Sequence, residues 1–211
     1  MDELFYNIDT RQKYKLLRVL EANTLVYKKN NIILSSVKQD NIICVLVSGH
    51  LQIIKTDYDG NRTIIEDLEE NSVFGSMTSS ISNTEYDILT KEDSKIIVID
   101  FDEVINYDET KNHYFNQFLK NLLQIMSDKI KKNNARIEIL TNKTIRDKLL
   151  SYFKINNNNR IVHLPFTLTD LADYLAVNRS AMSRELKNLK DEGFIEIKGK
   201  RIRLLYHFDI D

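Results

Sequence analysis

Cysteine is nearly absent from the 211-residue chain, which contains Cys44 alone. One cysteine excludes a disulfide within the chain and any metal or iron–sulfur site made only of cysteines. Cys44 lies in the apolar run IICVLV. A small buried hydrophobic side chain is the expected role there, and a reactive sensor thiol is the alternative.

Long apolar runs are missing as well. No stretch of about 18 apolar residues could span a membrane, and the acidic N-terminal segment MDELFYNIDTRQ lacks the apolar core of a signal peptide. We therefore expect a soluble, cytoplasmic protein without a membrane partner.

The sequence also lacks the motifs of common enzyme classes. It has no Walker loop, GxGxxG, HExxH or GxSxG pattern. The acidic pairs Glu69–Glu70 and Glu92–Asp93 fall at expected turns, where a solvated acidic surface is the ordinary role. We predict that the chain is not an enzyme and has no cofactor and no metal site.

Charge is distributed unevenly along the chain, although the net charge is only −1. Residues 1–110 carry 11 Lys and Arg against 20 Asp and Glu, whereas residues 141–211 carry 13 against 9. An acidic first half and a basic second half suit a protein that presents one end to a polyanion.

The most informative stretch is residues 165–205. We predict a helix over residues 168–175, capped by Thr167, and a second helix over residues 178–192, capped by Asn178 and ended by Gly193. Strands over 194–198 and 200–204 would then surround a hairpin turn at Gly199–Lys200. This order predicts a helix-turn-helix followed by a basic β-hairpin.

The second of these helices has two chemically different faces. At about 100° per residue, Met182, Leu186 and Leu189 share an apolar face. The opposite face carries five hydrogen-bond donors with no acid among them: Arg179, Ser180, Ser183, Arg184 and Lys187. Arginine offers a planar fork to guanine, and serine reaches phosphates or base edges. A surface helix with a solvated basic face is the alternative, but the two-helix spacing and the basic hairpin favour binding to double-stranded DNA.

The first half of the chain shows a different pattern. Residues 11–22 are expected to form a short amphipathic helix, and short apolar runs over residues 25–99 predict an all-β sandwich or barrel. Asp59–Gly60 predicts a two-residue hairpin turn, and residues 95–100 predict a buried strand that closes the domain.

Residues 112–140 contain neither proline nor glycine and predict a long helix. Seven positions along it alternate by four and three residues, as in a coiled-coil seam: Leu119, Leu123, Met126, Ile130, Asn133, Ile137 and Leu140. Packing of this face on the β domain is the alternative. Self-association into a homodimer is favoured, with Asn133 as the single polar residue that sets the register.

The order of these parts resembles the Crp–Fnr superfamily of bacterial transcription regulators. The resemblance covers essentially the whole chain and is strongest in LADYLAVNRSAMSREL, GFIEIKGKRIRL and the segments VSGHLQI, DYDGNRTI and VFG. It implies an α+β fold with a sensor β-roll over residues 1–110, a dimerisation helix over 111–140 and a winged helix-turn-helix over 141–211. It also implies a homodimer that reads a near-palindromic DNA site, with RNA polymerase as a further candidate partner.

Several residues match the positions that contact DNA in that family. Arg179 and Arg184 match its recognition-helix arginines, while Thr167, Thr169, Lys198 and Lys200 match positions that touch phosphate. The family commonly has an acid where this chain has Ser180, so we expect a different base preference there. A signalling module whose C-terminal part binds protein remains the alternative function.

The sensor departs from the cyclic-nucleotide binders of the family. Their Gly–Glu pair becomes Gly75–Ser76 after Phe74, their arginine position becomes Tyr86, and no arginine occurs between Arg62 and Arg136. A buried phosphate without such partners would be costly, so control by cyclic AMP is not expected. These four residues remain candidates for an effector pocket, and the effector itself is unknown. Two further alternatives are that the roll binds a protein or peptide partner, or that it is structural only and binds no effector.

Overall fold

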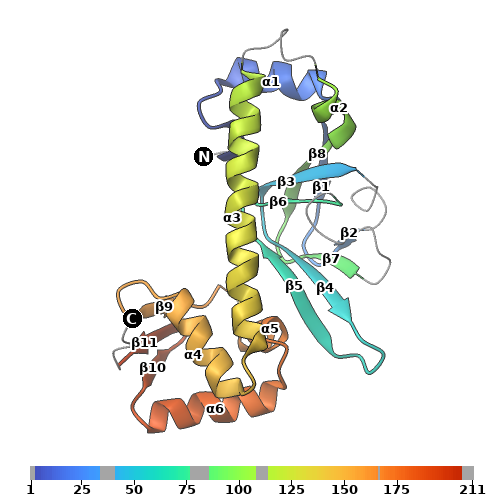
Figure 1. Cartoon of the computed structure of the whole chain (residues 1–211). Coiled ribbons are helices and arrows are strands. Elements are labelled where there is room, and N and C mark those ends of the chain that lie inside the picture. The colour runs from blue at the N-terminus through green and yellow to red at the C-terminus, as the bar shows by residue number, and fades with distance from the viewer. Residues whose placement is uncertain (1–2, 34–40, 77–85, 108–113, 166, 206–211) are drawn as a thin grey trace. The chain divides into compact units, whose positions relative to one another are not determined.

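The computed structural model describes residues 3–33, 41–76, 86–107, 114–165 and 167–205 (Figure 1). The chain divides into two compact units, and the boundary in the sequence falls between Ile130 and Lys131. Of the described helices, none has the length and apolar character that crossing a membrane requires.

The first unit contains a β-roll made of two antiparallel four-stranded sheets (Figure 1). One sheet has the order β1-β8-β3-β6 and the other has the order β2-β7-β4-β5. The strands are β1 (Asn23–Tyr27), β2 (Ile32–Ile33), β3 (Ile42–Ser48), β4 (Leu51–Thr56), β5 (Arg62–Leu68), β6 (Val73–Phe74), β7 (Tyr86–Thr90) and β8 (Ser94–Asp100). Apolar side chains from both sheets, among them Leu46, Ile53, Ile88 and Ile96, form the core between them. The eight strands confirm the predicted β-roll.

The predicted two-residue turn at Asp59–Gly60 is wrong. β4 ends at Thr56 and β5 begins at Arg62, so the loop has five residues. The Asp57 carboxylate accepts hydrogen bonds from the backbone of Asp59 and Asn61, and the Asp57 N–H donates to the Asn61 carbonyl at 3.0 Å. The Asp57 side chain and these backbone hydrogen bonds close the loop together, which the Asp-Gly pattern does not reveal.

Cys44 lies on β3 and is fully buried in the core of the roll. Burial raises the pKa of its thiol far above the ordinary range, because an apolar environment disfavours the thiolate. Cys44 therefore acts as a small hydrophobic side chain, and the alternative of a reactive sensor thiol lacks support.

Helices cover the β1-β8-β3-β6 sheet of the roll. They are α1 (Thr10–Val19), α2 (Phe101–Ile105) and the first part of α3 (Phe115–Thr141), preceded by the short helix η1 (Glu3–Phe5). Leu16 and Leu20 pack with Phe118 and Leu122 in a second apolar cluster against strands β3 and β8. Asp9 caps α1 by accepting the Gln12 N–H at 2.8 Å, and this capping box fixes where the helix begins.

The second unit is a helical domain with a three-stranded sheet. It contains α4 (Ile145–Ile155), β9 (Ile161–His163), α5 (Leu168–Tyr174), α6 (Arg179–Asp191), β10 (Ile195–Lys198) and β11 (Arg201–Leu204). The strand order is β10-β11-β9, and one apolar core joins the helices to the sheet. Helices α2 and α4 and strand β9 were not expected from the sequence. A signal for α4 was present, because Thr144 caps it by accepting the Asp147 N–H at 3.0 Å.

Candidate nucleic-acid interface

Two capped helices build the predicted helix-turn-helix. Thr167 caps α5 through the Asp170 N–H, and Asn178 caps α6 through the Ala181 N–H at 3.1 Å. The turn between them passes through Ala176 with a φ of 50°. Both caps agree with the sequence analysis, because the capping side chains act within one turn of each helix.

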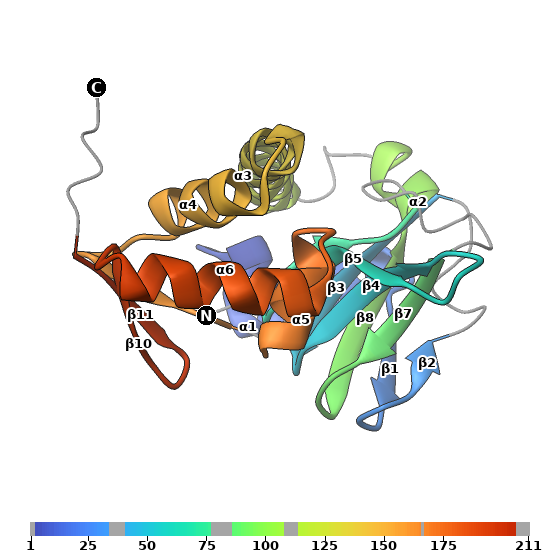
Figure 2. The ribbon, with the colours of Figure 1, turned by 90° about the horizontal axis from the view of Figure 1, so that it is seen from below.

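The two faces of α6 are separated as predicted. Met182, Leu186 and Leu189 are 0–3% exposed within the core of the second unit. The side chains of all five predicted donors are exposed: Arg179, Ser180, Ser183, Arg184 and Lys187. Figure 2 shows α6 lying along one face of this unit with the β10–β11 hairpin beside it. Asp191 falls on the donor face too, near 120° on the helical wheel, so the face is free of acid only as far as Lys187.

The hairpin carries a positive tip. Gly199 and Lys200 form the predicted two-residue turn, because Lys198 pairs directly with Arg201 and Gly199 has a φ of 59°. Lys198 and Lys200 are exposed, and the Lys200 ammonium lies 3.4 Å from the Pro165 carbonyl. Arg201 is also exposed and was missed by the sequence analysis, although the basic character of the hairpin pointed to it.

The two threonines that open α5 differ in their surroundings. The Thr167 hydroxyl accepts the Asp170 N–H and donates to the Asp170 carboxylate at 2.9 Å, so it is engaged in the cap. Thr169 is half-buried and Thr167 is exposed. Both lie within the first turn or cap of α5, next to the positively charged helix terminus.

One side of α3 is apolar and uncovered. Leu123, Ile130 and Ile137 are 66%, 59% and 58% exposed, and they recur at every seventh residue. Leu119 and Met126 are partly buried against the core of the roll, and Leu140 is half-buried, while Asn133 is exposed. This seven-residue spacing of exposed apolar side chains is the one found in the seam of paired helices.

Three of the four candidate effector residues have structural roles in the roll. Phe74 is fully buried in the core, and Gly75 has a φ of 124°. A Cβ atom at Gly75 would lie 2.4 Å from the Ile42 carbonyl oxygen, so only glycine fits. The Ser76 hydroxyl accepts the Ile42 N–H at 3.0 Å, which joins the end of β6 to β3.

Tyr86, the fourth candidate, lies beside a cation that the sequence analysis missed. The Lys55 ammonium lies 5.7 Å from the centre of the Tyr86 ring, because β4 and β7 are paired at these two residues. Lys55 and Tyr86 are 31 positions apart, so their pairing could not be read from the sequence around Phe74–Tyr86. Lys129 of α3 is a second cation at the roll that was not expected from the sequence. Its ammonium lies 2.7 Å from the Glu66 carboxylate and 3.2 Å from the Val73 carbonyl.

A cleft of about 750 Å³ lies elsewhere in the first unit, between α1 and the β1-β8-β3-β6 sheet. Its lining includes Phe5, Lys13, Tyr14 and Lys95, but none of the four candidate effector residues. Burial, followed by the nearby charge of Lys95, lowers the pKa of Lys13.

A histidine–carboxylate pair bridges β5 and the turn before β4. The His50 Nε2 atom lies 2.9 Å from an oxygen of Asp67, and Gln52 donates to the same oxygen at 2.9 Å. The hydrogen bond with Asp67 raises the pKa of His50, with smaller contributions from the charges of Asp67, Glu69 and Glu92.

This pair predicts a pH-dependent contribution to stability. Since folding raises the pKa of His50, the contribution is complete below the unfolded value near 6.5 and is lost as pH rises through the folded value. Between pH 6 and pH 8 we expect the melting temperature to fall by about 1–2 °C more in the unmodified chain than in an Asp67→Asn variant. Thermal unfolding followed by circular dichroism measures the difference, and parallel curves would contradict it.

Comparison with known proteins gives matches over both units. The model of the cyclic nucleotide-binding domain family matches residues 24–110, and that of the Crp-like helix-turn-helix domain matches residues 146–207. The transcriptional activator protein FnrL of Cereibacter sphaeroides is 23% identical over 190 residues, which cover 83% of this chain and 73% of FnrL.

Solved structures share the fold across both units. A CooA variant from Carboxydothermus hydrogenoformans superimposes with a TM-score of 0.70 at 19% identity, over 91% of this chain and 90% of CooA. A cyclic nucleotide-binding domain containing protein from Listeria monocytogenes gives 0.69 at 18% identity, over 91% of this chain and 97% of that protein.

Proposed function

The chain belongs to the Crp–Fnr family of transcription regulators and carries its DNA-binding helix-turn-helix, and from this premise we propose that it acts as a homodimer on a near-palindromic DNA site without control by cyclic AMP. In this proposal α6 of each copy enters the major groove of one half-site. The hairpin around Gly199–Lys200 contacts the neighbouring phosphates. The exposed donor face of α6, held by a buried apolar face, is the observation that carries the proposal.

The proposed roles of the donors follow from their chemistry. Arg179 and Arg184 suit bidentate contact with guanine, while Ser180, Ser183 and Lys187 suit phosphates or base edges. Thr167, Thr169, Lys198 and Lys200 are proposed phosphate contacts around this helix. Ser180 can accept a hydrogen bond from cytosine only without the charge assistance that a carboxylate gives, so the half-site is proposed to differ at that base from sites read by an acidic residue.

The dimer is proposed to form along α3. The stripe of Leu123, Ile130 and Ile137 has the seven-residue spacing that buries side chains between two parallel helices. Leu119, Met126, Asn133 and Leu140 complete the seam, and the exposed Asn133 amide can pair with its counterpart across it. Two copies would then present two reading helices to successive turns of the duplex.

Cyclic AMP is a poor fit to the roll. The Ser76 hydroxyl is already hydrogen-bonded to the backbone of β3, and the sequence has no arginine between Arg62 and Arg136. Lys55 brings a charge near Tyr86, but an ammonium lacks the planar fork that binds phosphate in two places. The chain therefore either responds to another effector or binds DNA without one.

Selection of bound fragments from the host genome tests the proposal directly. We expect a narrow set of near-palindromic sites, the same with and without added cyclic AMP, and an affinity that falls steeply with salt through counterion release. An Arg179→Ala/Arg184→Ala variant serves as the matched control that keeps the fold. A chain that ignores duplex DNA and heparin but retains a protein partner would support the alternative of a signalling module.

Lys200→Ala tests the role of the hairpin tip. We expect weaker binding to all DNA sequences alike and a salt dependence that is shallower by about one unit, because one phosphate contact is lost. Titration of specific and random duplexes at several salt concentrations measures both quantities. A loss confined to one sequence would show that Lys200 contacts a base.

A further inference from the structure

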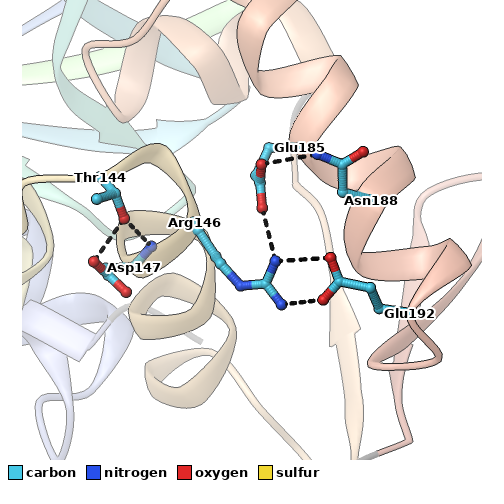
Figure 3. Close-up of polar contacts among 6 residues, drawn as sticks. All are labelled: Thr144, Arg146, Asp147, Glu185, Asn188 and Glu192. Atoms are coloured by element: carbon cyan, nitrogen blue, oxygen red, sulfur yellow. Dashed lines mark hydrogen bonds and ion pairs between the residues drawn. The ribbon is translucent and has the colours of Figure 1, made fainter.

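Arg146, in the first turn of α4, makes a branched set of contacts with α6. One guanidinium nitrogen lies 3.2 Å from the Glu185 carboxylate and 3.1 Å from the Glu192 carboxylate, and the other nitrogen bonds the second oxygen of Glu192. The guanidinium also lies over the Phe194 ring, 5.1 Å from its centre. Figure 3 shows Arg146 between the two acids, with Asn188 donating to the far side of Glu185 at 3.2 Å.

The two acids lie on the side of α6 that faces away from the donors. With Arg179 at zero and about 100° per residue, Glu185 and Glu192 fall near 240° and 220°, whereas the five donors occupy about 0° to 140°. Glu185 lies on α6 and Glu192 is its C-cap residue, so both carboxylates are carried by the element that is proposed to approach a polyanion. Unmasked, each would repel phosphate over a distance of about 10 Å at moderate salt.

Arg146 is suited to mask them. Its planar fork grips both oxygens of Glu192 while reaching Glu185, and a bidentate arginine–carboxylate pair fixes geometry as well as charge. The hydrogen bond from Arg146 lowers the pKa of Glu192, so this carboxylate stays ionised and depends on its partner for neutralisation. Only the tertiary structure reveals the cluster, because Arg146 is 39 and 46 positions from the two acids.

We propose that Arg146 is a positioning residue for DNA binding, which holds the two carboxylates of α6 against α4 and masks their charge from the duplex. The proposal rests on the proposed function. It makes the affinity of α6 for DNA depend on a residue that touches no nucleotide. Neutralising the carboxylates should therefore replace the need for Arg146.

The test compares four variants of the full chain on one selected duplex at low and moderate salt. Arg146→Gln is expected to lose about tenfold in affinity, more at low salt than at moderate salt. The triple variant R146Q/E185Q/E192Q is expected to recover most of this loss. In E185Q/E192Q, where Arg146 has already masked the two charges, the same neutralisation should tighten binding much less than it does in the Arg146→Gln background. Lys154→Gln removes an exposed charge from the last turn of the same helix and serves as the matched control, with little change expected.

The triple variant keeps the test independent of folding. Both the triple variant and Arg146→Gln lack the contacts of Arg146. A recovery of DNA affinity in the triple variant therefore comes from the loss of the two negative charges. Melting temperatures verify that both variants are folded. A triple variant as weak as Arg146→Gln, or a Lys154→Gln loss of the same size, would overturn the inference. If the unmodified chain binds no duplex, the proposed function fails; if it binds and Arg146→Gln binds equally well, only this inference fails.

Discussion

Replacing Leu123 and Ile130 with lysine is expected to convert the proposed dimer into monomers and to abolish tight binding to a two-half-site duplex. The two side chains are 66% and 59% exposed in a single chain, so lysine should leave the fold of one copy intact. Across the seam, however, it would place like charges where apolar side chains meet. Losing the second reading helix should lower affinity by about 10²- to 10⁴-fold, the usual gain from linking two binding modules.

Sedimentation velocity and a duplex titration measure the two effects. Gln124→Lys with Asp128→Asn is the matched control, because it adds the same charge to α3 on the face away from the seam. We expect this control to remain dimeric and to bind DNA. Dimers that persist in the Leu123→Lys/Ile130→Lys variant would place the contact between copies elsewhere.

Arg184→Ala is expected to cost about 1–3 kcal/mol of specific binding and to relax the preference at one base pair. Arg184 is exposed near the middle of α6, on the face opposite the core residues Leu186 and Leu189. Its loss should therefore leave the stability of the second unit unchanged. The fork of an arginine matches O6 and N7 of guanine, and alanine offers no substitute for it.

Titration against a panel of duplexes, each changed at one base pair, resolves this effect. Arg184→Lys is the informative control, since it keeps the positive charge and loses the fork, so affinity for random DNA should persist while the base preference is lost. An Arg184→Ala variant with the same base preference as the unmodified chain would remove Arg184 from sequence reading.

Local sequence signals predicted α5, α6 and the β10–β11 hairpin well. The caps at Thr167 and Asn178 and the turn at Gly199–Lys200 lie where the sequence analysis put them, because capping and tight turns depend on residues within about four positions. Two of the failures are also local in origin. Asp57 closes a five-residue loop where an Asp-Gly turn was expected, and the capping pair of Thr144 and Asp147 at the start of α4 was overlooked.

Contacts between distant parts of the chain were beyond the reach of pattern reading. The pairing of Lys55 with Tyr86 follows from the strand register of β4 and β7, and the Arg146 cluster follows from the packing of α4 against α6. The sequence had placed Ser76 as a pocket candidate, whereas its hydroxyl is bonded to the Ile42 N–H. In each case the partner comes from a distant segment that the tertiary structure brings alongside.

The order of residues alone determined the family, the β-roll, the long helix and the division of α6 into an apolar and a cationic face. Periodicity and caps act over one or two turns, and so they can be read directly from the chain. Tertiary structure decided which charges meet, which hydroxyls are already bonded and which apolar stripe stays uncovered. These depend on packing between elements far apart in sequence, where the free energy of a contact comes from burial and geometry rather than spacing.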